Sequence, residues 1–448
     1  MARAPRSVEI RSYQVGFGDC FLLSFVYGPT DKRHVLIDFG TTELPVRGQP
    51  RAPAKASQHM PEVAKDIARV SEGRLTAVVA THRHADHISG FATDARTGKS
   101  GEIIAKLKPK VVIQPWTEDP RAARDARKAT RDSSASRRGF IAGLGAMHDI
   151  AAVVADLAQR RASWFGPALA KQLRFLGEDN IRNASAVKNL IAMGKARGAV
   201  AVWARHGSTS GLERHLPGVK VHVLGPPDLT QTETIKTMRS KDPSEFWHLL
   251  AGRSGLRDGV PLAQGLNGGR RTAGVPAEAR WFRERLERMQ REQLLEIVRT
   301  LDDQMNNTSL ILLFEVFGRK LLFPGDAQLE NWSYALVDAP TRDRTQRLLA
   351  AVDVYKVGHH GSLNATPKTL LWERFAHRKG NGRRKPARVL TTLLSTLPGK
   401  HGSTQRKTEV PRTPLLKALE AETELFNTDT LSFAAKNTEL CHTVEVKP

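Results

Sequence analysis

Three histidines and one aspartate lie within six residues of one another in the segment Thr81–Gly90. His82 and His84 alternate, and Asp86 and His87 follow directly after them. Imidazole nitrogen and carboxylate oxygen are the ligands of borderline divalent ions such as zinc. A loop can direct the alternating pair at one ion and the adjacent pair at a second, so the sequence predicts a metal-binding loop. The other interpretation is a polar surface loop that happens to be rich in histidine, and the close spacing of four ligands disfavours it.

Predicted strands precede this loop and the other candidate ligands. The apolar run 75–80 leads directly into the histidine loop and is rich in β-branched residues, which is typical of a buried strand. Similar apolar runs lead into Asp38, into Asp326 and into the pair His359–His360, each with a glycine nearby that permits a turn. The sequence therefore predicts several strand ends that each deliver an acid or an imidazole.

In this order and chemistry the chain resembles the metallo-β-lactamase fold superfamily. Within it, the chain is most similar to the hydrolase domain of ComEC/Rec2-type DNA-uptake proteins. Four motifs carry the likeness to that subgroup: Val15–Cys20, Asn306–Leu310, Pro324–Ala327 and Lys356–Ser362. The likeness covers residues 8–116 and 300–440, with a weaker echo at 219–227. It implies an α/β fold, namely a four-layer αββα sandwich with a basic, largely helical insertion.

The resemblance also implies a dinuclear metal centre. Two divalent ions about 3.5–4 Å apart can clamp a phosphodiester and hold a bridging hydroxide between them. Zinc is the expected metal and manganese the alternative. Six residues would hold the ions, with Asp86 also catalytic: His82 and His84 at the first ion, Asp86, His87 and His360 at the second, and Asp326 between the two.

Other residues near these ligands are expected to act on them or on the substrate. His359 would be a general acid that protonates the leaving group, or would support its neighbour. Asp38 and Asp19 are expected to accept hydrogen bonds from ring N–H groups or backbone amides and so to orient ligands. For Asp38 a plain turn cap is the other interpretation.

The first ion is expected to lack one imidazole. Many members of the superfamily carry a histidine just before the strand that leads to the bridging aspartate, and this chain has Asn307 there. Weaker and exchangeable binding of that ion is therefore expected. Asn307 could supply an amide oxygen, or substrate and water could fill the gap. Four histidines of the intervening region are further candidates: His148, His206, His215 and His222.

The composition of the chain favours a polyanionic partner. The 448 residues carry a formal net charge of +23, which favours nucleic acid as a partner. The other interpretation is that the charge reflects a proteome that is basic in general. No apolar stretch approaches the roughly 20 residues that cross a bilayer, and the N-terminus does not resemble a signal peptide. A cytoplasmic protein without a membrane partner is therefore expected. Cys20 and Cys441 do not suggest a disulfide framework, and Cys20 is expected in the core.

The chain divides into three predicted regions. Residues 1–116 and 301–448 are expected to form the two halves of the fold, and residues 117–300 an insertion. Within the insertion, residues 118–138 are basic, residues 277–301 form a charged helix, and strands of the fold resume near 199–224.

A basic loop lies downstream of the histidine pair. Residues 377–388 contain no acid, and the loop is expected to bind nucleic acid through Arg383, Arg384 and Lys385, together with Lys356 at the preceding strand end. The expected function is a metal-dependent phosphodiesterase that acts on DNA. Hydrolysis of a small ester, lactone, thioester or cyclic nucleotide is the alternative, which the long basic insertion disfavours. A non-enzymatic nucleic-acid-binding scaffold is disfavoured because the central ligands are all present.

Overall fold

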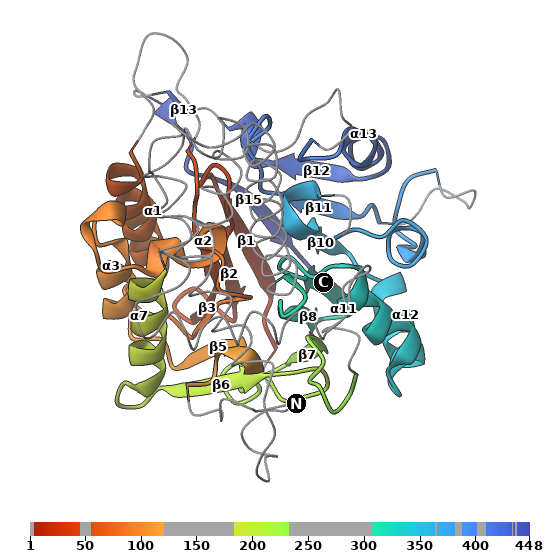
Figure 1. Cartoon of the computed structure of the whole chain (residues 1–448), viewed down its shortest axis with the longest axis horizontal. Helices are drawn as coiled ribbons and strands as arrows, with labels where there is room; N and C mark the ends of the chain where they lie inside the picture. Colours follow the sequence, from red (N-terminus) through yellow and green to blue (C-terminus); the bar gives the residue numbers. More distant parts are fainter. Residues whose placement is uncertain are drawn as a thin grey trace, which may run out of the picture.

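The computed structural model describes residues 4–44, 55–120, 183–232, 306–362, 365–380, 388–400, 409–431, 433–434 and 437–448. Two β-sheets lie in the middle of the molecule, and helices cover the outer face of each (Figure 1). The predicted four-layer αββα sandwich is therefore confirmed. The charged helix expected at 277–301 and the basic segment 118–138 lie largely or wholly outside the described residues.

The first sheet contains seven strands in the described part of the chain, in the order β15-β1-β2-β3-β4-β5-β6. The strands β1 to β3 pair antiparallel, whereas β3 to β6 run parallel. The last strand, β15, pairs antiparallel with β1, so the end of the chain completes this sheet. The bounds are β1 (Ser7–Tyr13), β2 (Cys20–Val26), β3 (Lys32–Phe39), β4 (Ala77–Val79), β5 (Val111–Pro115), β6 (Val200–Ala204) and β15 (Cys441–Val446).

The second sheet has the order β12-β11-β10-β9-β8-β7 among the described residues. Strands β9 to β12 run parallel, and β7, β8 and β9 pair antiparallel. Its strands are β7 (Val219–Gly225), β8 (Ile311–Val316), β9 (Arg319–Phe323), β10 (Val354–Lys356), β11 (Thr391–Leu394) and β12 (Glu424–Asn427), and β13 (Phe433–Ala434) and β14 (Asn437–Thr438) form a separate hairpin. Because β6 and β7 form one edge of each sheet, part of the region 117–300 belongs to the sandwich itself.

Apolar side chains fill the space between the sheets and the space under the helices. Phe21 of the first sheet packs against Phe323 of the second, with ring centroids 5.7 Å apart. Over the first sheet, Met60, Val63 and Ile67 of α1 are buried at the spacing of one helix face. Among the described residues, six helices make the outer layers: α1 (Ala56–Val70), α3 (Ser100–Lys106) and α7 (Ala184–Lys195) over the first sheet, and α11 (Leu329–Ser333), α12 (Arg342–Ala350) and α13 (Thr413–Glu422) over the second.

The other helices of the described residues are short and lie in the connections between the longer elements. They are α2 (Ala85–Ile88), η1 (Ser89–Phe91), η2 (Ala95–Thr97), η3 (Trp116–Glu118), η6 (Tyr334–Asp338), η7 (Gly358–Gly361), η8 (Trp372–Arg374) and η9 (Thr428–Thr430). Within the described residues, no helix combines the length and the apolar character that a membrane span requires. Cys20 is fully buried, as predicted.

Candidate metal centre

The histidine loop lies at the end of β4 and continues into α2. His82, His84, Asp86 and His87 are all buried. Nε2 of His82 lies 2.9 Å from Nδ1 of His84, and the rings of His82 and His87 are 4.2 Å apart between centroids. Four polar side chains at this depth need charged or hydrogen-bonding partners, because burial without them is costly. The loop therefore concentrates potential ligand atoms at one point.

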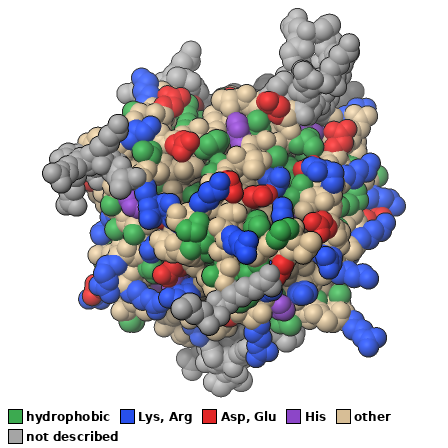
Figure 2. Space-filling model, turned by 180° about the vertical axis from the view of Figure 1, so that it is seen from behind, with side chains coloured by type: hydrophobic (Ala, Val, Ile, Leu, Met, Phe, Trp, Pro, Cys, Tyr) green, Lys and Arg blue, Asp and Glu red, His purple; other side chains and the backbone are tan. Residues whose placement is uncertain are grey.

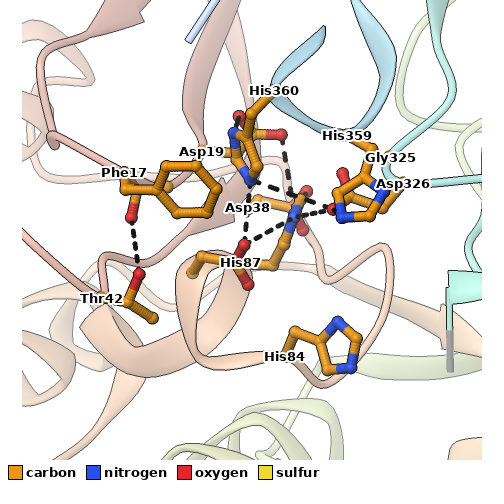
Figure 3. A network of polar contacts seen from close by, with 12 residues as sticks. Phe17, Asp19, Asp38, Thr42, His84, His87, Gly325, Asp326, His359 and His360 are labelled. Carbon is orange, nitrogen blue, oxygen red and sulfur yellow. Dashed lines mark hydrogen bonds and ion pairs between the residues drawn. The ribbon is translucent and has the colours of Figure 1, made fainter. Parts of the chain in front are cut away.

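Residues from the second sheet complete a group of four potential ligands. Ligand atoms of Asp86, His87, Asp326 and His360 all lie within 4.8 Å of one another. Nε2 of His360 is 2.9 Å from Oδ2 of Asp86, and Nε2 of His87 is 3.1 Å from Oδ2 of Asp326. Figure 3 shows His87, Asp326 and His360 joined by such contacts, with His84 to one side. The two halves of the chain therefore meet at this group.

A second group adjoins the first and shares one carboxylate with it. Ligand atoms of His82, His84 and Asp86 lie within 4.8 Å of one another. The residue common to both groups is Asp86, whereas the resemblance to the superfamily implies Asp326 between the two ions. The bridging role of Asp326 stays a prediction. Two adjoining groups of ligands are the arrangement that a dinuclear centre requires.

Asp38, at the end of β3, holds both the loop and one imidazole. Its Oδ1 accepts a hydrogen bond from the backbone N–H of Thr81 at 2.7 Å, and its Oδ2 lies 2.8 Å from the hydroxyl of Thr81 and 2.8 Å from Nδ1 of His87. Because Nδ1 of His87 is engaged in this way, Nε2 is the atom left to face Asp326. These are the contacts expected of a residue that orients a ligand.

A backbone carbonyl orients the other imidazole in the same manner. Ser395 follows β11, and its carbonyl oxygen lies 2.9 Å from Nδ1 of His360. The ring of Phe17 packs against the same imidazole, with centroids 4.3 Å apart (Figure 3). Both imidazoles of the four-residue group therefore present Nε2 to the carboxylates.

The backbone is strained where it presents several of these side chains. Asp38, His359 and His360 have positive φ angles of 55°, 45° and 52°, a conformation that residues other than glycine rarely adopt. Such strain concentrates at functional sites. Gly40 fits the same site for a different reason, since a Cβ there would lie 2.4 Å from the backbone of Asp86. A side chain at position 40 would therefore push the histidine loop away.

The charges of the cluster stabilise one another. Burial alone would raise the pKa of the Asp86 and Asp326 carboxyls, but the neighbouring His87 holds the pKa of both well below the ordinary value. Burial opposes protonation of His87, yet the surrounding carboxylates, Asp326 first, raise its pKa well above the ordinary value. For His82, burial lowers the pKa. The carboxylates are therefore ionised at neutral pH, as metal ligands must be.

The donor set and two buried atoms fit a divalent ion. Nε2 of His87 and Oδ2 of Asp326 are fully buried and lie 3.1 Å apart, and neither has a hydrogen-bond partner elsewhere among the described residues. These two atoms lie within a cluster of imidazoles and carboxylates, and a divalent ion that binds there would take the place of the proton on His87. Nitrogen and oxygen ligands of this kind suit zinc and related ions.

His359 lies at the rim of the cluster. Its side chain is 24% exposed, and its Nε2 is 3.7 Å from Oδ2 of Asp326. Burial lowers the pKa of His359 to about 4, so the ring is neutral near pH 7. A neutral ring is not the form that donates a proton as an acid, so the role of general acid stays a prediction.

Asn307 and the alternative histidines occupy different places. Asn307 is fully buried, and its side-chain amide has no hydrogen-bond partner among the described residues. Its chain segment lies beside the histidine loop, because the N–H of Leu310 donates to the carbonyl of Thr81. His206 instead contacts Thr341, and His222 contacts Glu315, at 2.9 Å and 3.0 Å.

Of the residues predicted to bind nucleic acid, one is buried and three lie outside the described residues. Lys356 is 1% exposed and forms an ion pair with Asp19. A buried ammonium of this kind cannot contribute to an exposed phosphate-binding surface, so the interpretation of Lys356 as a nucleic-acid contact is wrong. Arg383, Arg384 and Lys385 lie outside the described residues, as does His148.

Sequence reasoning missed several residues that shape the site. The carbonyl of Ser395 has no recognisable sequence pattern, and Phe17 lies within the motif Val15–Cys20 but was not assigned to the site. Thr81 stands directly before His82, and a hydroxyl beside a predicted ligand was the available signal. Gly40, two residues after Asp38, offered a similar signal, because glycine is common where two backbones approach closely.

Comparison with known proteins agrees with the fold and the cluster. Residues 14–156 match the family model described as the metallo-beta-lactamase superfamily. This segment of the chain is therefore similar to the metallo-β-lactamase superfamily, whose members are mostly metal-dependent hydrolases. The matched segment includes the histidine loop and ends before Asp326 and His360. A comparison with curated proteins found no match.

Proposed function

We propose that the chain is a metal-dependent phosphodiesterase that cleaves nucleic acid, with DNA as the expected substrate. The observation that carries the proposal is the pair of adjoining buried ligand groups that share Asp86. The likeness of the motifs to the ComEC/Rec2-type hydrolase domain supports the choice of substrate, as does the net charge of +23. Zinc is the metal we expect, with manganese as the alternative.

The residues of the cluster have distinct parts in this chemistry. Two divalent ions held there would stabilise charge on a phosphodiester and supply a nucleophile from water near neutral pH. Asp38 and the carbonyl of Ser395 keep the imidazoles of His87 and His360 in one orientation. We assign the protonation of the leaving oxygen to His359, whose side chain is partly exposed beside Asp326.

The charge of the chain supports a polyanionic substrate without defining one binding path. Figure 2 shows lysine and arginine side chains spread over the face opposite to that of Figure 1, with acidic side chains among them. Binding to phosphates releases counterions, so affinity for DNA should fall steeply with salt. The loop that contains Arg383, Arg384 and Lys385 is the part of the sequence to which we assign contacts with the backbone of the nucleic acid.

The test is cleavage of defined substrates by protein loaded with Zn²⁺ or Mn²⁺. Duplex DNA, single-stranded DNA and RNA are compared with a nitrophenyl phosphodiester, a lactone and a thioester. We expect cleavage of nucleic acid, and its loss in Asp326→Ala, since Asp326 is the buried carboxylate delivered by β9. Asp353→Ala removes a buried carboxylate elsewhere in the second sheet and serves as the control. Turnover of only the lactone or the thioester would refute the proposal, and so would full activity of Asp326→Ala.

A further inference from the structure

Lys356 is a buried cation in contact with the candidate metal centre. Its ammonium pairs with Asp19, lies 3.4 Å from Oδ1 of Asp326 and donates a hydrogen bond to the carbonyl of Gly325 at 3.1 Å. We propose that Lys356 is a positioning residue that fixes the Asp326 carboxylate so that one oxygen faces the ligand cluster. The inference rests on the metal-dependent function proposed above.

The strand that carries Lys356 explains how an ammonium reaches this place. Successive side chains of a strand point to opposite faces. In β10, Val354 packs in the apolar layer between the sheets and Tyr355 in the layer under the outer helices. Lys356 is therefore on the inner face, at the strand end, where the first sheet contributes Asp19. The long apolar stem spans the layer, and the charge lies at its end.

The two oxygens of Asp326 have different surroundings. Oδ1 faces the ammonium of Lys356, whereas Oδ2 lies 3.1 Å from Nε2 of His87 and 3.9 Å from Nε2 of His360. Rotation of the carboxylate would separate Oδ1 from the buried ammonium, which would then lose one of its two anionic partners. Because the same ammonium also binds the carbonyl of Gly325, Lys356 holds both the carboxylate and the turn that carries it.

Asp19 connects Lys356 to the rest of the cluster. It is fully buried, its carboxylate lies 3.6 Å from Nδ1 of both His87 and His360, and its backbone N–H donates to the carbonyl of Asp86 at 2.8 Å. Lys356 therefore links Asp326, which lies on the Nε2 side of the imidazoles, to Asp19, which lies on their Nδ1 side. Partners of this kind around metal ligands typically contribute about 10–100-fold to metal affinity.

The obvious variant, Lys356→Met, leaves Asp19 as a buried charge without its main partner and can fail to fold. The test is therefore a cycle of four proteins: wild type, Lys356→Met, Asp19→Asn and the double variant. In the double variant both members of the buried pair are neutral. Arg378→Met is the matched control, because Arg378 is also a buried cation, paired with Glu422 away from the cluster.

The measurement is calorimetric titration with Co²⁺, with thermal unfolding in chelator as the check of the fold. If Lys356 positions Asp326, the double variant binds Co²⁺ about 10–100-fold more weakly than Asp19→Asn alone, while Arg378→Met leaves the affinity unchanged. Equal affinities of Asp19→Asn and the double variant would overturn the inference, because Lys356 would then serve only as the counter-ion of Asp19. Wild-type protein that binds no Co²⁺ would instead refute the proposed function.

Discussion

Replacing Asp38 by asparagine should displace a metal ligand without disturbing the fold. Asparagine is nearly isosteric and tolerates the positive φ of 55° at this position. Its amide oxygen must take the place of Oδ1, which accepts the backbone N–H of Thr81 at 2.7 Å. The amide nitrogen then replaces Oδ2, which lies 2.8 Å from Nδ1 of His87.

The consequence is a change of tautomer at His87. An amide N–H can only donate, so Nδ1 must become an acceptor and the ring proton moves to Nε2. Nε2 is the atom that faces Asp326 and Asp86, so it is no longer available as a ligand. Loss of an orienting partner of this kind costs about 10–100-fold in metal affinity, or about 1.4–2.7 kcal/mol.

The assay is competition for Zn²⁺ against a chromogenic chelator near pH 7.5. Asp353→Asn is the control, because Asp353 is a buried carboxylate that also accepts a backbone N–H, from Lys320 at 2.9 Å. We expect Asp38→Asn to lose affinity at one of two sites and Asp353→Asn to lose none. Wild-type affinity in Asp38→Asn would refute the assignment of the orienting role, and equal losses in both variants would show a general effect on stability.

Two further predictions concern histidines. His360→Ala should lower metal content, because Nε2 of His360 lies 2.9 Å from Asp86. His359→Ala should keep the metal and lose about 10²–10⁴-fold in rate, with a smaller loss for a substrate that has a nitrophenolate leaving group. Loss of metal in His359→Ala would reverse the assignment. His34, away from the cluster, is buried beside Ser24, and burial lowers its pKa to about 4. The unfolded chain therefore takes up the proton first as the pH falls below about 6.5, and stability is lost between about pH 6.5 and 4, by about 2 kcal/mol from pH 7.5 to 5. Urea unfolding of wild type and His34→Gln checks this, and an equal pH dependence of the two proteins would contradict it.

The strands that lead into the candidate ligands could be predicted from short apolar runs in the sequence. The apolar run before the histidine loop became β4, and the runs before Asp326 and His359 became β9 and β10. Each run is apolar because both faces of a parallel strand are covered, which is visible without knowledge of its neighbours. The strand β15 was not predicted, because its alternating sequence is short and its pairing with β1 joins the two ends of the chain.

The candidate ligands could be predicted because metal binding depends on residue type. The role of Lys356 could not be predicted because it depends on how deeply the side chain is buried. A cluster of His and Asp indicates metal binding in any context, so the candidate ligands could be named and the structure brings them together. A lysine after two apolar residues is instead expected at the surface, because charged side chains rarely enter a core. Burial of Lys356 depends on Asp19 and Asp326, which are distant in sequence and meet it only when the sheets pack.

The same dependence on packing makes the centre a connection between the two sheets. His87 and Asp86 follow β4 of the first sheet, whereas Asp326 and His360 follow strands of the second, and no subset from one sheet completes the four-residue group. A metal ion that binds there binds the folded state and not the separated sheets, so it stabilises the sandwich by mass action. The residues that orient the ligands, Asp38 on one sheet and Ser395 on the other, must therefore be fixed by the apolar layer between the sheets before an ion can bind. The orientation of the ligand side chains consequently depends on the packing of the whole interface between the sheets.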